Sequence, residues 1–188
     1  RAADSVAYRG NGFIFDQMNG VQSFAPTFLM QFHTVDEEAD ARAYVSRISA
    51  AASALQDALA NTKANAANGA HAPKFAYAGV IDQSQKIITG APFTEGPDSA
   101  IWADFKGDVQ KLVEGGKMTP EAATALTAEA ETALKGPFLT FYNDLIAFCT
   151  ADMANSPDPA GPQGANLQPN GEAYYNFMLA GQTTTSMT

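Results

Sequence analysis

The sequence predicts an all-α fold, a multi-helix array without a β-sheet. Three observations lead to this prediction. Apolar residues recur at three- and four-residue intervals, and helix start and stop signals divide the chain. A third is that no stretch alternates apolar and polar residues as a half-buried strand does. The chain has 188 residues, 46 % of them hydrophobic, which is enough for one domain, or two small ones, with a real core.

The first 33 residues are rich in aromatic side chains and in turn-forming glycine, asparagine and proline. This composition predicts an irregular segment with short helical pieces. The segment is too apolar for a free tail, so we expect its large side chains to pack on a larger body. These side chains are Phe13, Phe15, Phe24, Phe28, Leu29 and Phe32.

The clearest helix signal covers residues 34–67. Thr34, followed three residues later by Glu37, is a capping-box pattern that marks a helix start. Apolar residues then recur at helical spacing along one face. They are Tyr44, Ile48, Ala52, Leu55 and Leu59. Asn68-Gly69 predicts the end of the helix, because both residue types favour the backbone conformation that closes one.

Two further helices are expected in the middle of the chain. Pro73 suits the first position of a helix, and Gly90 marks where that helix closes. The next helix begins with either Asp98 or Ser99 as its cap. A pair of glycines at 115–116 then stops it.

A long helical stretch with one interruption is expected over residues 119–154. Its start signal is Thr119-Pro120-Glu121, a cap followed by a first-turn proline and an acid. Gly136-Pro137 breaks or kinks the helix. Residues 155–171 are rich in proline and glycine and predict a loop, and a short helix is expected over residues 172–179.

These elements divide the chain into four expected segments. Residues 1–33 are the irregular aromatic-rich segment, and residues 34–154 are the helical body. Residues 155–171 form the Pro/Gly-rich loop, and residues 172–188 begin a segment that leads into further structure.

The charge balance is acidic, with 20 acidic residues, 11 basic residues and a net charge of −9. Nucleic acids and anionic membrane surfaces both require clusters of lysine and arginine, and the sequence has none, so neither is an expected partner. No run approaches the roughly 20 apolar residues of a membrane span. The acidic surface is therefore interpreted mainly as a source of solubility.

Residues that could carry catalysis or bind a metal are sparse. The two histidines, His33 and His71, form no His-Glu-x-x-His zinc motif, and we expect each to be an ordinary polar residue. Cys149 lies in an apolar run and is expected to be a small buried hydrophobic residue. Asp82 has apolar neighbours and is a candidate buried carboxylate, either structural or functional. We therefore predict no catalytic residue, no metal ligand and no cofactor in this chain.

The C-terminal segment is the most unusual part of the sequence. A pair of tyrosines follows the proline-rich loop, and three consecutive threonines follow the tyrosines. Their hydroxyl groups could hydrogen-bond a peptide backbone, which makes them candidate substrate-binding residues. The alternative is that the tyrosines pack and the threonines cap a following helix. The candidates are Tyr174, Tyr175, Thr183, Thr184 and Thr185.

The same segment resembles the bacterial domain of unknown function 885 family. That family commonly shows a Leu-Pro-x-Gly-x-x-Tyr-Tyr stretch and then a Thr-Thr run, to which residues 167–175 and 183–188 are similar. The sequence has one residue more than this pattern, at Gln168. Two upstream stretches are similar to the family as well, in the same order along the chain: residues 32–35 with 40–48, and residues 80–83.

The resemblance implies the N-terminal portion of a larger, mostly helical protein. Members of the family are often exported or lipid-anchored, and a downstream His-Glu-x-x-Pro-Gly-His-type motif groups them with zinc metallopeptidases. Zinc and the catalytic residues are then expected in a missing C-terminal part, which is also the expected partner, either in the same polypeptide or as a separate chain. The expected substrate is small and peptide-like.

Two readings of function remain open. In the first, the chain is the helical portion of a zinc-dependent peptidase- or dipeptidase-like hydrolase and walls the substrate cleft. In the second, it is a non-enzymatic periplasmic helical module for binding or scaffolding. We expect a periplasmic or secreted location in both readings. The resemblance to an often exported family favours it, and so does a first residue, Arg1, that is not methionine.

Overall fold

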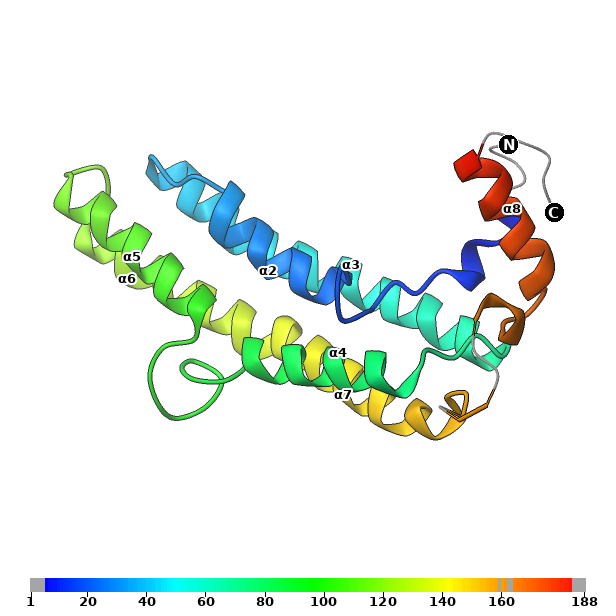
Figure 1. The fold of residues 1–188 in the computed structure, drawn as a ribbon. Helices are drawn as coiled ribbons and strands as arrows, with labels where there is room; N and C mark the ends of the chain where they lie inside the picture. The colour runs from blue at the N-terminus through cyan, green and yellow to red at the C-terminus, as the bar shows by residue number, and fades with distance from the viewer. Residues whose placement is uncertain (1–5, 159, 162–163, 184–188) are drawn as a thin grey trace.

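The computed structural model describes residues 6–158, 160–161 and 164–183, and over these residues the fold is all-helical. No strand occurs among them, and the nearest approach to a sheet is one isolated bridge between Ala91 and Asp98. This confirms the predicted fold class. The helices form an elongated array of nearly parallel and antiparallel rods (Figure 1).

Helix α3, Glu38–Ala67, runs along most of the array. Its start lies three residues later than predicted, because Glu37 and not Thr34 is the N-cap. Glu37 and Asp40 form the capping box: the Asp40 carboxylate accepts a hydrogen bond from the Glu37 backbone N–H at 3.1 Å. The end is as predicted, with Asn68 as the C-cap and Gly69 at a positive φ of 92°.

A second long rod lies beside α3 and has one interruption. It consists of α6, Pro120–Ala133, a short π-helical turn, and α7, Leu139–Asp152. Thr119 caps α6 by accepting a hydrogen bond from the Ala122 N–H at 3.2 Å. Gly136 is non-helical at the junction, and Pro137 follows it, so the predicted kink is confirmed.

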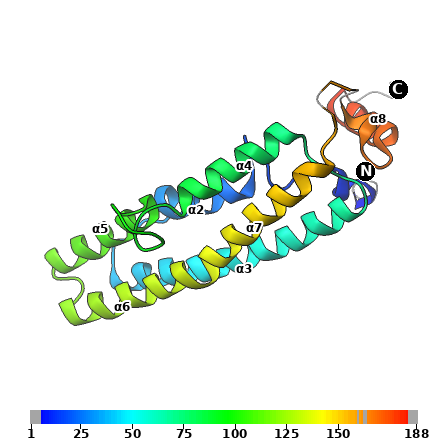
Figure 2. The ribbon, with the colours of Figure 1, turned by 90° about the horizontal axis from the view of Figure 1, so that it is seen from below.

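Two shorter helices follow one another along the array. α4, Lys74–Ile87, packs on α7, and α5, Ala100–Glu114, packs on α6 (Figure 2). The loop between them ends at Ser99, which is the N-cap of α5. Of the two caps that the sequence allowed, the structure selects Ser99.

Helix α2, Val21–Phe32, corrects the expectation that residues 1–33 are irregular with only short helical pieces. Pro26 lies inside α2 and has no N–H to donate to the carbonyl of Gln22. The buried Tyr142 hydroxyl donates to that carbonyl instead, at 2.6 Å. A hydrogen bond from α7 thus replaces the one that proline removes, and the helix continues through Pro26.

One hydrophobic core extends through the whole array, with residues from α2 to α7. Its largest fully buried side chains are aromatic, and they lie on α3, α5, α7 and the π-helical turn before α7. They are Tyr44, Phe105, Phe138, Phe141 and Tyr142. Close aromatic pairs join them, such as Tyr44 with Phe105 at 5.3 Å between ring centroids. Such a core supports the array as a single packed unit.

One end of the array carries additional structure. Helix α8, Gly171–Thr183, lies there against the described N-terminal residues, with Tyr8 stacked on Phe177 at 5.0 Å (Figure 1). Asn11 donates a hydrogen bond to the Pro169 carbonyl at 2.7 Å. The described part of the predicted 155–171 loop is irregular apart from short 3₁₀ turns, which agrees with the prediction. This end therefore brings the first and last described parts of the chain together.

Candidate functional site

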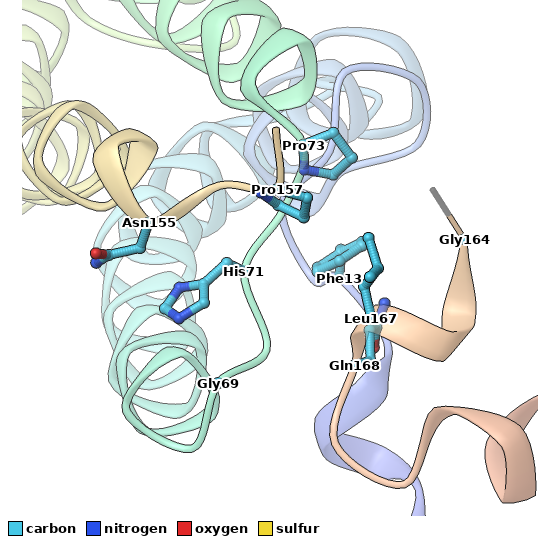
Figure 3. A pocket seen from close by; sticks show the side chains of 9 residues that line it. All are labelled: Phe13, Gly69, His71, Pro73, Asn155, Pro157, Gly164, Leu167 and Gln168. Atoms are coloured by element: carbon cyan, nitrogen blue, oxygen red, sulfur yellow. The ribbon is translucent and has the colours of Figure 1, made fainter. Parts of the chain in front are cut away.

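A cavity of about 390 Å³ lies at this end of the array, where the start of α4, the end of α7 and the following loop meet (Figure 3). Its volume lies within the range of small-molecule sites in proteins. In Figure 3, His71 and Asn155 lie on one side, and Phe13 and Leu167 lie on the other. The lining residues are Phe13, Gly69, His71, Pro73, Asn155, Pro157, Gly164, Leu167 and Gln168.

A hydrogen-bond network around Asp152 positions the histidine of this cavity. Asp152 is the last residue of α7, and its side chain is 9 % exposed. One of its carboxylate oxygens lies 2.9 Å from His71 Nδ1 and also accepts the hydroxyl of Tyr77. The other oxygen accepts the amide of Asn155 at 3.0 Å. The network ties the loop after α3 and the first turns of α4 to the end of α7.

The network also sets the protonation states of Asp152 and Tyr77. Burial acts to raise the pKa of Asp152, but hydrogen bonds from Tyr77, Asn155 and His71 outweigh it and hold the pKa below the ordinary value of 3.8. Burial and the bond to Asp152 raise the pKa of Tyr77. At neutral pH a carboxylate therefore faces a neutral phenol and the ring of His71.

The pairing of His71 with Asp152 defines what the cavity can do. A carboxylate only accepts hydrogen bonds, so Nδ1 is the protonated ring nitrogen and Nε2 is left for a ligand. A carboxylate–imidazole pair of this kind can hold a polar ligand or transfer a proton. The described lining contains no serine, threonine or cysteine. The cavity thus offers an oriented imidazole opposite the apolar side chains of Phe13 and Leu167, without an adjacent nucleophile among the described lining residues.

The other residues considered from the sequence have structural surroundings. His33 is buried, with Nε2 at 2.9 Å from the Asp40 carbonyl and Nδ1 bonded to Arg47. Cys149 is buried and unpaired, and burial together with the charge of Asp152 raises the pKa of its thiol to about 12. A thiol with so high a pKa has very little of the reactive thiolate at neutral pH.

The expectation that Asp82 could be a buried carboxylate is wrong. Helix α4 buries the face that carries Tyr77, Val80 and Ser84, and Asp82 projects from the opposite side. There it is exposed and pairs with Lys86 one turn later, at 2.6 Å. Exposed pairs of this kind contribute little to stability.

No group of three or more histidine, cysteine, aspartate or glutamate side chains that could hold a metal occurs among residues 6–158, 160–161 and 164–183. His33 and His71 lie at opposite ends of α3, so they do not share a site. The described donor set does not fit a zinc centre, which needs three or four such ligands. No chemical step is therefore assigned to a metal on this part of the chain.

The predicted substrate-binding residues lie on and after α8, next to the cavity end. Tyr174 is half-buried and packs near Tyr8, with 6.0 Å between ring centroids, whereas Tyr175 is exposed. Thr183 donates its hydroxyl to the Leu179 carbonyl. Thr184 and Thr185 lie outside the described residues. A role in substrate binding stays a prediction for all five.

No pattern in the sequence points to the His71–Asp152 pair. The two residues are 81 positions apart, and neither belongs to a recognisable motif. The sequence predicts only that His71 is an ordinary polar residue and that Asp152 falls in the helical stretch expected over residues 119–154. Their pairing depends on the packing of α4 against α7, which is visible only in three dimensions.

Comparison with solved structures shows a related fold. The array is similar to the crystal structure of a putative lipoprotein from Colwellia psychrerythraea, with a TM-score of 0.75 and 16 % sequence identity. The match covers 94 % of this chain but only 28 % of that protein. No curated protein matches the sequence. In the part of the chain that the structure describes, no helix is both long and apolar enough to cross a membrane.

One protein-family model matches the chain over its whole given length. The model of the family described as "Bacterial protein of unknown function (DUF885)" matches residues 1–188. The match includes the tyrosine pair and the threonine run on which the sequence resemblance depended. The chain therefore belongs to the DUF885 family.

Proposed function

We propose that this chain is the helical portion of a larger zinc-dependent peptidase- or dipeptidase-like hydrolase, whose catalytic residues lie on a further part of the polypeptide. The observation that most supports the proposal is the unequal coverage of the Colwellia protein. Nearly all of this chain matches, yet the match accounts for 28 % of that protein. A helical unit of this kind thus occurs inside a much longer chain. The hydrolase class comes from the family resemblance at the Tyr-Tyr and Thr-Thr segment.

Within such a hydrolase, the cavity end of the array would wall the substrate cleft. His71 provides an oriented hydrogen-bonding group, and the apolar side chains around it suit the body of a short peptide. Helix α8, which carries Tyr174 and Tyr175, lies at the same end. The zinc and the general base would belong to the further part, and this chain would bind and orient the substrate.

An extracytoplasmic location is part of the proposal. It is supported by the description of the structurally similar Colwellia protein as a putative lipoprotein and by the export that the family resemblance implies. The alternative function is a non-enzymatic helical module that binds a ligand or acts as a scaffold in the periplasm. The continuous core favours this alternative, since a unit that buries its own core can be stable without further chain.

Activity of the natural gene product tests the proposal. We expect the purified product to contain about one zinc ion per polypeptide and to hydrolyse short peptides, with activity lost on chelation. Replacing His71 with alanine should raise KM and largely retain kcat, because the residue binds substrate without taking part in the bond cleavage. An exposed control, Asp82→Ala, should change neither. A product that binds peptides without zinc and without hydrolysis would favour the binding module.

A further inference from the structure

An apolar groove of about 490 Å³ lies between α2 and α3, away from the His71 cavity. The two helices are in contact, and Figure 1 shows them running along the same edge of the array. Of the lining residues, only Arg47 is charged at neutral pH, and no acid is among them. The groove is lined by Val21, Phe24, Ala25, Phe28, Leu29, Arg47, Ala50, Ala51, Ala54, Leu55 and Ala58.

A row of three phenylalanines on α2 forms one wall of the groove and continues past it. Phe24, Phe28 and Phe32 are 60 %, 41 % and 66 % exposed. Their rings follow one another at 5.9 Å and 6.0 Å between centroids, as side chains four residues apart on a helix do. Large aromatic side chains contribute most when buried, so a contiguous exposed row marks an interaction surface.

The other wall of the groove has small side chains. Ala50, Ala51, Ala54 and Ala58 line it from α3. Residues at these spacings face the same side of a helix, and alanine lets a neighbouring backbone approach closely. A ridge of aromatic rings beside a stripe of alanines fits the large side chains of a third helix, which is how amphipathic helices bind grooves.

We propose that this groove binds an amphipathic helix from a further part of the same polypeptide, with large aliphatic residues on its buried face. The inference rests on the proposed function, in which the chain continues beyond this unit. In the Colwellia protein most of the chain lies outside the matched part, so further chain is available to cover an apolar surface of the unit. The groove, with the exposed phenylalanine row beside it, is an extended apolar surface on which such a helix can pack.

Charge favours this occupant over a second copy of the chain. Each copy has a net charge of −9, so two copies repel one another as they associate. The exposed Arg47 at the groove instead attracts an acidic residue on the docked helix. The proposed helix therefore carries an apolar face and at least one acid near its edge.

Photo-crosslinking in the natural gene product tests the proposal. Benzoylphenylalanine is placed at Phe28, with a second version at Phe24. The matched control places it at Phe75, which is on α4, equally apolar, 66 % exposed and outside the groove. We expect crosslinks from positions 28 and 24 to one helical segment of the same polypeptide beyond residue 188, several-fold more abundant than any from position 75.

Two other outcomes would overturn the docking proposal. Crosslinks that join position 28 of two copies would show that a second chain covers the groove. Crosslinking at 28 and 24 no greater than at 75 would show that nothing covers it. Neither outcome affects zinc content or peptide hydrolysis, so the proposed function would survive both. A gene product that ends at Thr188 would instead remove the proposed function and this inference together.

Discussion

Replacing Asp152 with alanine is expected to destabilise the fold by about 3 kcal/mol, because three partners lose a charged acceptor at once. Tyr77, Asn155 and His71 all bond to this carboxylate. The Tyr77 hydroxyl is buried and would be left with only the Ala72 N–H as a partner. Denaturant unfolding followed by circular dichroism measures the loss as a lower midpoint at an unchanged slope.

Two comparisons make the Asp152 prediction specific. Asp152→Asn keeps one acceptor for Tyr77 and should cost less, about 1 kcal/mol. Asp82→Ala removes an exposed carboxylate that pairs only with Lys86, and it should change stability by less than about 0.5 kcal/mol. Equal losses for Asp152→Ala and Asp82→Ala would show that the network contributes nothing beyond surface charge.

The pH dependence of the same variant follows from the lowered pKa of Asp152. A carboxyl group whose pKa is lower in the folded state stabilises the fold fully above its ordinary value of 3.8. That stabilisation is lost as the pH falls through the lower folded-state pKa. The difference between wild type and Asp152→Ala should therefore shrink as the pH falls below about 4. A difference that stayed constant or grew over this acid range would contradict the lowered pKa of Asp152.

Replacing Tyr142 with phenylalanine is expected to cost about 2 kcal/mol, because the Gln22 carbonyl would be buried without a donor. The hydroxyl donates to that carbonyl at 2.6 Å, and both residues are fully buried. The loss should depend on Pro26. In a Pro26→Ala background the new backbone N–H can donate to Gln22 along the helix, so the same Tyr142→Phe change should cost about 1 kcal/mol or less.

A double-mutant cycle measures this dependence from four unfolding curves. Any cavity left by removing the proline ring is present in both Pro26→Ala proteins and cancels from the coupling energy. Tyr175→Phe, which removes an exposed hydroxyl, should be neutral. If Tyr142→Phe costs the same with proline and with alanine at position 26, the hydroxyl does not replace the missing helical donor.

The predictable parts of the fold were those encoded locally. The end of α3 at Asn68-Gly69, the start of α6 at Thr119 and the kink at Gly136 each depend on a few adjacent residues, and all agree with the structure. The start of α3 lies three residues later than predicted because Glu37 forms the capping box with Asp40, and not with Thr34. Local signals thus located most of the helices but not every boundary.

The parts that could not be predicted depend on contacts between distant residues. Helix α2 was missed because Pro26 suggests a break, and the compensating donor, Tyr142, is 116 positions further along the chain. The His71–Asp152 pair needs α4 and α7 to pack before either residue has a partner. Nothing in the spacing of these residues along the sequence reveals that they meet.

The intact mass of the natural gene product, measured directly by mass spectrometry, tests the central claim that this helical unit is part of a larger protein. We expect a polypeptide far heavier than the 19.8 kDa of this chain, or this chain in tight association with a second fragment. The His71 cavity and the groove beside the Phe24–Phe32 row would then both face further protein or substrate. A monodisperse natural product of 19.8 kDa that unfolds cooperatively would contradict the claim.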